Sequence, residues 1–371
     1  MRRFSVTLLL ASLVLSALAK PYSVRQTTDP TDPTDPADPP DGPDGDGDGD
    51  DDTNADGNVP DLGDGNGIPD VSNATNPQCV PWYGIRDAIL GGIFQGRCGD
   101  NSRAAVRLAF HDAGTFSLGL QGLGRPNGAA DGSMIWDPTE VTRTENNGLQ
   151  NIVGILKPLP AQFGVSPGDI LHLAGVLGVL ACPGGPRIDA FVGRPLPLNV
   201  APTDRLPNPE DPVELLLAKF EDMSFSVRSM IALIGAHSTG KQRFVDPARN
   251  GSSFDSTVNV WDVDFYGETA HGTTDPDVFT LDSDRFLANN VSTIMEFHRY
   301  INNQPDWDED YRAAHFQMST LGINQSALIN CTEIMPASIN LTTLTINGTV
   351  DPDLLEAATQ KYRAPWLVPS S

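Results

Sequence analysis

Apolar side chains recur every three or four positions along most of the chain beyond Cys79. This spacing predicts a mainly α-helical fold, with Pro- and Gly-rich connectors between the helices. Strand signals are few and short, and the Thr- and Asn-rich tail beyond Pro336 is predicted to be an extended surface segment. The predicted helices span residues 82–94, 102–112, 148–156, 167–180, 213–220, 226–237, 284–299 and 305–321.

The first seventy residues show a different pattern. Arg2 and Arg3 precede an apolar run that ends in small residues at Ala17 and Ala19, which predicts a secretory signal peptide over residues 1–19. Residues 20–70 repeat Thr-Asp-Pro and then Asp-Gly, with almost no large apolar side chains. Such a segment cannot bury enough surface to offset its ordering entropy, so we predict a disordered acidic spacer.

One stretch of this spacer resembles a calcium-binding loop. Asp44, Asp46, Asp48 and Gly49 match the start of an EF-hand loop, but Ala55 stands where the loop needs Glu. Low-complexity Asp-Gly sequence produces this match easily, so a chance match is the favoured interpretation.

The charge balance excludes some partners. The chain of 371 residues has 24 Lys and Arg against 48 Asp and Glu, a formal net charge of −24 at pH 7. Nucleic acids and anionic lipid surfaces are bound through clustered basic residues, so neither is an expected partner. No later apolar run is long enough for a membrane span, and we expect a secreted, extracellular, soluble protein. Seven glycosylation sequons agree with secretion and begin at Asn73, Asn250, Asn290, Asn324, Asn330, Asn340 and Asn347.

The cysteine count has a structural implication of its own. In an oxidising compartment, four cysteines suggest two disulfides. Counting alone leaves three pairings open among Cys79, Cys98, Cys182 and Cys331.

Two histidines lie among residues of unusual chemistry. Arg107 and His111 are four residues apart on a predicted helix and share a face that Phe110 adjoins, while Asp112 points about 100° away. His237 ends another apolar helix. Taken alone, each histidine more commonly indicates a hydrogen-bonded, partly buried core residue.

Together with their surroundings, these motifs resemble the secreted fungal class II enzymes of the plant, fungal and bacterial haem peroxidase superfamily. The resemblance covers about residues 79–335. It implies a mainly α, two-domain fold that sandwiches one haem b between a distal domain (71–195) and a proximal domain (196–335), followed by the tail (336–371). The matching motifs are Arg107-Leu108-Ala109-Phe110-His111-Asp112, Ala236-His237-Ser238, Phe254-Asp255-Ser256-Thr257 and Leu281-Asp282-Ser283-Asp284.

On the distal side, the resemblance implies a catalytic group. His111 would move the proton of hydrogen peroxide, and Arg107 would stabilise the charge that develops as the O–O bond breaks. Asn146 would orient His111, supported by Glu140, although this pair alone also fits a solvated polar loop. Phe110 would line the haem pocket.

On the proximal side, the resemblance implies an iron site. His237 would ligate the haem iron, and Asp284 would accept its other ring N–H and make the imidazole more basic. Phe254 would lie against the same pocket.

The resemblance also implies two Ca²⁺ sites, each one residue along the chain from a haem-pocket histidine. Oxygen ligands of mixed kind suit Ca²⁺. The distal site would take Asp112, Asp131, Ser133 and the carbonyl of Ala129, where the family usually has Gly. The proximal site would take Ser238, Asp255, Thr257, the carbonyl of Val260, and Asp262.

The chain departs from the family in its cysteines. Class II enzymes usually have four disulfides, and only two can form here. The matching cysteines imply the pairs Cys79–Cys331 and Cys98–Cys182.

The specialised substrate sites of the family are also altered. The positions of the manganese-binding carboxylates hold Asp100, Ala104 and Arg243, which would bind Mn²⁺ poorly. The position of the surface Trp of lignin-type enzymes holds Ala232. Another aromatic such as Trp307 could relay electrons, but a core Trp is the favoured interpretation.

The resemblance therefore implies an extracellular, monomeric peroxidase. It would use hydrogen peroxide to oxidise small donors, phenols above all, by one-electron steps at the haem edge, and so remove peroxide under oxidative stress. The loop at residues 195–209 would border the entrance. The alternative is a haem- and calcium-containing cell-wall binding glycoprotein with little catalysis, but binding alone needs no Arg107, His111 and Asn146 set.

Overall fold

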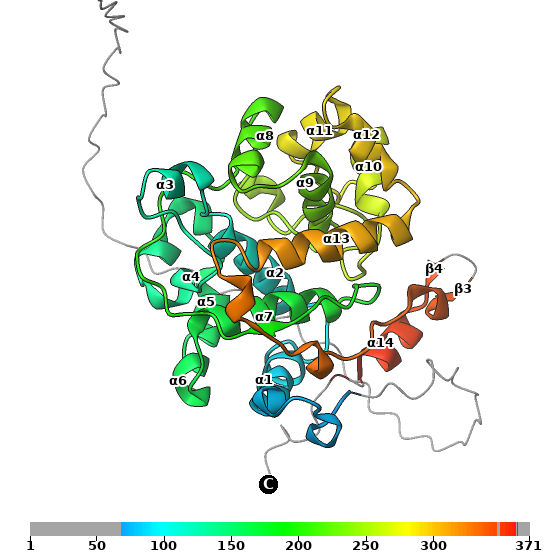
Figure 1. Ribbon diagram of the computed structural model, residues 1–371. Helices are drawn as coiled ribbons and strands as arrows, with labels where there is room; N and C mark the ends of the chain where they lie inside the picture. Colours follow the sequence, from blue (N-terminus) through cyan, green and yellow to red (C-terminus); the bar gives the residue numbers. More distant parts are fainter. Residues whose placement is uncertain (1–67, 347–348, 361, 363–371) are drawn as a thin grey trace, which may run out of the picture. The chain divides into compact units, whose positions relative to one another are not determined.

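The computed structural model describes residues 68–346, 349–360 and 362, and these are mainly helical, as the apolar spacing predicts (Figure 1). The α-helices are α1 (Val80–Asp87), α2 (Asp100–Ala113), α3 (Leu118–Gly122), α4 (Ser133–Trp136), α5 (Gln150–Leu156), α6 (Leu159–Phe163), α7 (Pro167–Leu180), α8 (Val213–Asp222), α9 (Val227–Ile234), α10 (Asp264–His271), α11 (Asp282–Asn289), α12 (Ile294–Arg299), α13 (Gln304–Met318) and α14 (Pro352–Gln360).

Short elements connect these helices. A π-helical stretch, Ala88–Ile93, continues α1. Strand β1 (Phe191–Val192) pairs antiparallel with β2 (Ile329–Asn330), and β3 (Thr345–Ile346) pairs antiparallel with β4 (Thr349–Val350). The 3₁₀ segments are Val71–Asn73, Pro77–Cys79, Glu140–Thr142, Thr144–Asn146, Gly235–Thr239, Pro247–Arg249, Gln325–Ala327, Thr332–Ile334 and Leu341–Thr343.

The described residues all belong to one unit, Val59–Ser371, by their contacts. The predicted signal peptide, the EF-hand-like stretch and nearly all of the predicted spacer lie outside the described residues. The expected boundary near residue 195, between distal and proximal domains, stays a prediction. Within the described part of the chain, no helix combines the length and the apolar character needed to cross a bilayer.

The core is built on α7, in which every residue is buried, and α2 packs along it (Figure 1). Two glycines of α7 make the close approach possible. A Cβ on Gly175 would lie 2.6 Å from the Cβ of Ala109, and one on Gly178 would lie 2.5 Å from the carbonyl oxygen of Ser102. Because Ser102 and Ala109 face α7, the face of α2 that carries Arg107 is turned away from this contact.

The second packed pair is α9 with α13, and it fixes the segment that ends in His237. The indole N–H of Trp307 donates to the carbonyl of Ala232 at 2.9 Å, and the hydroxyl of Tyr266 donates to the carbonyl of Ile231 at 2.8 Å. Gly235 follows, where an added Cβ would lie 2.3 Å from the Tyr266 hydroxyl oxygen and 2.5 Å from the Trp307 nitrogen. The chain just before His237 is therefore held by two aromatic residues.

Both disulfides implied by the family resemblance are formed. Cys79 is bonded to Cys331 across 252 positions of sequence, and Cys98 is bonded to Cys182 across 84. This confirms one of the three pairings that the count alone allowed.

Two predictions of local structure are wrong. The predicted helix at 284–299 is interrupted, because Asn290 has an extended backbone and the Thr293 hydroxyl donates to the carbonyl of Leu287 at 2.6 Å. The tail is not extended throughout. It contains the β3–β4 hairpin and α14, and it packs against the chain after α1, where a Cβ on Gly96 would lie 2.8 Å from the Cβ of Tyr362.

Candidate active site

The distal group of residues converges on His111, near the C-terminal end of α2. The Nδ1 of His111 lies 2.8 Å from the side-chain oxygen of Asn146. The amide nitrogen of Asn146 donates to the main-chain carbonyl of Glu140 at 2.7 Å, so its oxygen must face the histidine. His111 therefore carries its proton on Nδ1 and keeps the lone pair of Nε2 as a base.

Arg107 points its guanidinium at that lone pair. Its Nε donates to Nε2 of His111 at 3.1 Å, while its two terminal nitrogens donate to the carbonyls of Asn147 at 2.8 Å and Glu145 at 3.0 Å. Burial lowers the pKa of Arg107 to about 10, which leaves it charged at neutral pH. Arg107 nevertheless keeps contact with solvent.

The environment keeps His111 neutral. Burial, and then the charge of Arg107, hold the pKa of His111 well below its ordinary value, while the hydrogen bond with Asn146 acts in the opposite direction. Phe110 borders this imidazole edge-on, with ring centres 6.1 Å apart, and stacks on Phe220. A neutral imidazole beside a fixed cation can accept a proton while the cation stabilises the anion that forms.

Glu140 supports Asn146, but through its main-chain carbonyl rather than its carboxylate. The carboxylate is fully buried, and neither of its oxygens has a hydrogen-bond partner among the described residues. Burial, followed by the charge of Asp112, raises the pKa of Glu140 to about 8. The group is therefore mostly protonated at neutral pH.

The proximal group centres on His237, in the 3₁₀ turn Gly235–Thr239 after α9. Its Nδ1 lies 2.8 Å from a carboxylate oxygen of Asp284 on α11. Phe254 and Phe265 flank the imidazole, with ring centres at 5.0 Å and 5.7 Å. The Asp284 side chain is 2% exposed and that of His237 is 34% exposed, so the imidazole reaches solvent while its partner is buried.

These residues fit a haem group. With Nδ1 engaged by Asp284, the other nitrogen of His237 keeps a lone pair suited to iron. The partly exposed ring, with Phe254 beside it, leaves an apolar surface of the kind that a planar macrocycle covers.

The residues expected at the distal calcium site lie together. Asp112 is fully buried and accepts from the main chain of Gly132 at 2.9 Å, and Asp131 accepts from the main chain of Ser133 at 3.1 Å. The Ser133 hydroxyl lies 3.4 Å from Asp112, and Ala129 precedes Asp131 by two positions in the same loop. Burial raises the pKa of Asp112 to about 6 and, together with the charge of Asp112, that of Asp131 to about 7.

The residues expected at the proximal calcium site are also adjacent. The Thr257 hydroxyl donates to Asp262 at 3.0 Å, and the Ser238 hydroxyl lies 3.4 Å from the carbonyl of Val260. Asp255 is fully buried, and its Oδ2 has no hydrogen-bond partner among the described residues. Burial and the charge of Asp262 raise the pKa of Asp255 to about 8, and burial raises that of Asp262 to about 7.

An orphaned buried carboxylate oxygen beside hydroxyl and carbonyl oxygens fits a calcium ion. Within the described ranges, no three His, Cys, Asp or Glu side chains are grouped as a metal site. Each expected calcium site has only two carboxylates, and the remaining ligands would be hydroxyl and main-chain oxygens.

The structure shows the surroundings of the residues that replace the manganese ligands and the surface tryptophan of the family. Arg243 donates a hydrogen bond to the carboxylate of Asp100 at 2.8 Å, and Ala104 lies one turn further along α2. Ala232 and Trp307 are both fully buried, so Trp307 is a core residue as predicted.

Two contacts of the distal group were not predicted from the sequence. His172 on α7 pairs with Asp112 at 3.0 Å, and the sulfur of Met134 accepts from the amide of Asn146 at 3.3 Å. The signal for His172 was a lone histidine within an otherwise apolar helix. Met134 had no signal, because its role depends on where α4 lies.

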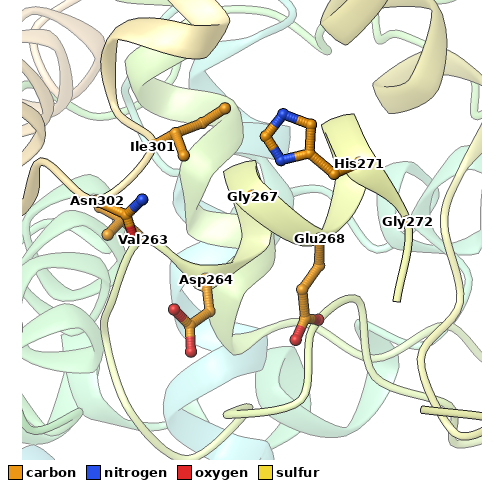
Figure 2. Close-up of a pocket in the computed structure, with 8 residues that line it drawn as sticks. All are labelled: Val263, Asp264, Gly267, Glu268, His271, Gly272, Ile301 and Asn302. Carbon is orange, nitrogen blue, oxygen red and sulfur yellow. The ribbon is translucent and has the colours of Figure 1, made fainter. Parts of the chain in front are cut away.

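A pocket on the surface of α10 contains none of the expected site residues (Figure 2). Asp264 and Glu268 point to the same side of it, with His271 further along the helix (Figure 2). Glu268 already accepts from the main chain of Ser256 at 3.0 Å, and we assign no function to this pocket.

Comparison with known proteins identifies the family of this chain. A sequence model of the family described as peroxidase matches residues 88–303. Ligninase H2 of Phanerodontia chrysosporium is 34% identical over 299 residues, which cover 75% of this chain and 80% of the relative. Manganese peroxidase 3 of Phlebia radiata is 34% identical over 284 residues, covering 71% and 78%. Versatile peroxidase VPS1 of Pleurotus eryngii is 33% identical over 285 residues, covering 72% and 77%.

The mainly helical fold and these matches define a peroxidase, an oxidoreductase that acts on hydrogen peroxide. More particularly, the chain belongs to the family of fungal class II haem peroxidases.

Proposed function

We propose that this protein is an extracellular peroxidase that binds one haem b and two Ca²⁺ ions, and that oxidises small phenolic donors at the haem edge. The observation that carries the proposal is the arrangement of Arg107, His111 and Asn146. Their contacts give a neutral, oriented base beside a fixed cation. A haem-carrying protein that only binds a cell wall has no need of this arrangement.

The proposed role of the distal residues follows from their atoms. Nε2 of His111 accepts the proton of the first peroxide oxygen and then delivers it to the leaving oxygen. Asn146 keeps the proton of the imidazole on Nδ1 throughout. Arg107 leaves Nε2 when peroxide enters and donates to the oxygen on which negative charge grows. A haem held by His237 would supply the redox chemistry: the two-electron reduction of peroxide and the one-electron oxidation of donors.

The proposed role of the proximal residues is to hold the iron. His237 would hold the iron through Nε2, and Asp284, which lies 2.8 Å from Nδ1, would make the imidazole a stronger donor. The two calcium sites then hold the segments that follow each histidine, since Asp112 follows His111 and Ser238 follows His237. The distal half would end near residue 195, and the loop at 195–209 would border the donor entrance.

We further propose that the donors are neither Mn²⁺ nor large lignin-like polymers that require a surface Trp. Arg243 occupies one of the expected manganese positions and neutralises Asp100. Ala232 is buried and its methyl side chain cannot be oxidised, so it cannot replace an exposed tryptophan.

The experiment is stopped-flow absorbance of the haem-loaded protein mixed with peroxide, comparing wild type with His111→Leu. We expect the Soret band of wild type to change rapidly, and the variant to be slower by roughly 10²–10⁴-fold. Equal rates in both proteins would exclude His111 as the base and favour the binding role.

A further inference from the structure

Three exposed apolar side chains lie where α11 ends and α12 begins. Phe286 on α11 is 40% exposed, Val291 in the connection is 89% exposed, and Met295 on α12 is 79% exposed. Large apolar side chains that gather on one part of a surface mark a place that another group covers. We call Phe286, Val291 and Met295 the apolar patch.

A glycosylation sequon lies in the middle of the apolar patch. It begins at Asn290 and has Val291 as its central residue. Asn290 caps α11 four residues after Phe286, so the two lie one turn apart on the same side of the helix. The main-chain carbonyl of Asn290 accepts from the main-chain nitrogen of Ile294 at 2.8 Å, and Met295 is the next residue. Asn290 is therefore adjacent to all three members of the patch.

The main chain of Asn290 is fixed, whereas its side-chain nitrogen is not engaged. Its carbonyl also accepts from the main chain of Thr293 at 3.0 Å, and its side-chain oxygen accepts from the main chain of Ser292 at 2.9 Å. Its amide nitrogen, the atom that carries an N-linked sugar, has no hydrogen-bond partner among the described residues. A sugar attached there would start from a fixed point and would displace no protein contact.

The other sequons whose side chains are described lack such a patch. Near Asn250, Val245 is exposed, but no other large apolar side chain within five positions along the chain is. Within the same distance of Asn324, Asn330 and Asn340, no large apolar side chain is exposed. Among these sequons, a sugar at Asn290 would therefore cover the most apolar surface.

Phe286 offers an aromatic face to a sugar. The guanidinium of Arg285 lies 5.9 Å from the centre of the Phe286 ring, and Arg285 is also paired with Asp282. The remaining ring surface is open to solvent. The first N-acetylglucosamine of an N-linked glycan has an apolar face of C–H groups, and such a face packs on an aromatic ring through dispersion contacts.

Met295 adds a chemical consequence, because it differs from the five other methionines that the structure describes. These are at most 2% exposed: Met134, Met223, Met230, Met318 and Met335. Hydrogen peroxide oxidises an exposed thioether to a sulfoxide. One peroxide oxygen bonds to the sulfur as the O–O bond breaks, the sulfur loses two electrons, and the other oxygen leaves as water. A sugar that covers Met295 would slow this reaction.

We infer that Asn290 carries an N-linked glycan whose first sugar packs on Phe286 and shields Met295 from peroxide. This inference goes beyond the proposed function but rests on the extracellular location that it includes, since N-linked glycans are added during secretion. The helix α11 also carries Asp284, so the glycan would stabilise the helix that holds the partner of His237.

The first test maps the modification. The full chain is expressed in yeast in two forms, with its own N-terminus and with a yeast secretion leader added in front, and glycopeptides are identified by mass spectrometry. We expect a glycan on Asn290. Ser292→Ala removes the sequon and keeps the main-chain nitrogen that donates to Asn290. Ser252→Ala, which removes the sequon of Asn250, is the matched control.

The second test measures what the glycan does. Wild type should melt about 2 °C above Ser292→Ala, and enzymatic trimming of wild type to a single N-acetylglucosamine should keep most of this difference. Phe286→Ala should lower Tm more in the glycosylated protein than in the Ser292→Ala background. Leu123→Ala is the control, because Leu123 is 71% exposed and should give the same shift in both. Peroxide should oxidise Met295 several-fold more slowly in wild type than in Ser292→Ala.

Two results would overturn the inference. The first is an exported chain in which Asn290 is unmodified. The second is a modified Asn290 with the same Tm and the same rate of Met295 oxidation in wild type, Ser292→Ala and Ser252→Ala, because the sugar would then point into solvent. If only the form with the added leader is exported, the proposed extracellular location fails instead, and the glycopeptides of that form still decide the inference.

Discussion

The side-chain oxygen of Asn146 lies 2.8 Å from Nδ1 of His111, and the amide nitrogen of Asn146 is already used by the carbonyl of Glu140. The hydrogen bond therefore has one direction, and the orientation of one amide determines which imidazole nitrogen is basic. In Asn146→Leu we expect the rate of the peroxide step to fall on the order of 10²-fold. The variant should also move the acid limb of its pH profile to lower pH, because this hydrogen bond raises the pKa of His111.

Rapid mixing with peroxide between pH 4 and 8 measures both effects. Asn147→Ala is the control, because Asn147 contacts Arg107 through its main-chain carbonyl and the substitution keeps that carbonyl. A pH profile of Asn146→Leu that coincides with that of the control would exclude an orienting role.

The contact between His237 and Asp284 leads to a prediction about the iron. In Asp284→Asn the imidazole loses an anionic acceptor and becomes a weaker electron donor, so the Fe(III)/Fe(II) reduction potential should become more positive with haem retained. Spectroelectrochemical titration measures the shift. Asp282→Asn is the control, because Asp282 lies one half-turn earlier on α11 but is exposed and pairs with Arg285. Equal potentials in the two variants would argue that Asp284 does not act on the iron through His237.

Chelation should destabilise the protein, and more so at high pH. The pKa of Asp255 is raised to about 8 and that of Asp262 to about 7. When the pKa of a carboxyl group is higher in the folded than in the unfolded state, its ionisation favours the unfolded state. The free energy of unfolding therefore falls as the pH rises from the unfolded to the folded pKa. Calcium bound at the proposed site would remove this penalty by balancing the charges.

The measurement is differential scanning calorimetry with and without EGTA. At pH 8 we expect chelation to lower Tm by roughly 5–10 °C per site lost, and at pH 5 by much less. Asp255→Ala should remove a large part of the sensitivity to EGTA. A Tm that does not respond to EGTA at pH 8 would contradict both calcium sites.

A partly buried carboxyl group on α13, that of Asp308, gives a prediction about stability that is independent of metals. Burial raises the pKa of Asp308 to about 7, although Gln304 donates to it at 2.8 Å. Because the charged form is disfavoured in the folded state, Asp308→Asn should raise the free energy of unfolding by about 1–2 kcal/mol at pH 8 and by close to zero at pH 4.

Urea unfolding at the two pH values checks this prediction. Asp306→Asn serves as the control, since Asp306 lies on the same helix, is partly exposed and pairs with Arg299. An equal effect of both substitutions at pH 8 would show that burial of Asp308 is not the cause.

The helices that could be predicted from sequence are those whose burial is one-sided or complete. The amphipathic α2 and the wholly buried α7 leave a clear apolar pattern. The break between α11 and α12 could not be predicted, because it depends on one hydroxyl of Thr293 that competes for a main-chain carbonyl. The helix α14 did have a signal: Asp351 accepts from the main chain of Asp353 and Leu354, and Pro352 stands at the first helical position.

The residues of the candidate site also divide into those that could be placed from sequence and those that could not. Residues four apart on one helix, such as Arg107 and His111, can be placed together from sequence alone. Asn146 and Asp284 came only from the family resemblance, because each reaches its histidine from another segment of the chain.

The bond between Cys79 and Cys331 closes a covalent ring that contains both histidines of the candidate site. In the covalent sense, residues before Cys79 and after Cys331 are not part of this ring. A force that pulled the two ends of the chain apart would follow the covalent path through the sulfur–sulfur bond, and this path does not include α2 or α9. Pulling on the two ends of the chain would therefore put little tension on the segments that carry His111 and His237.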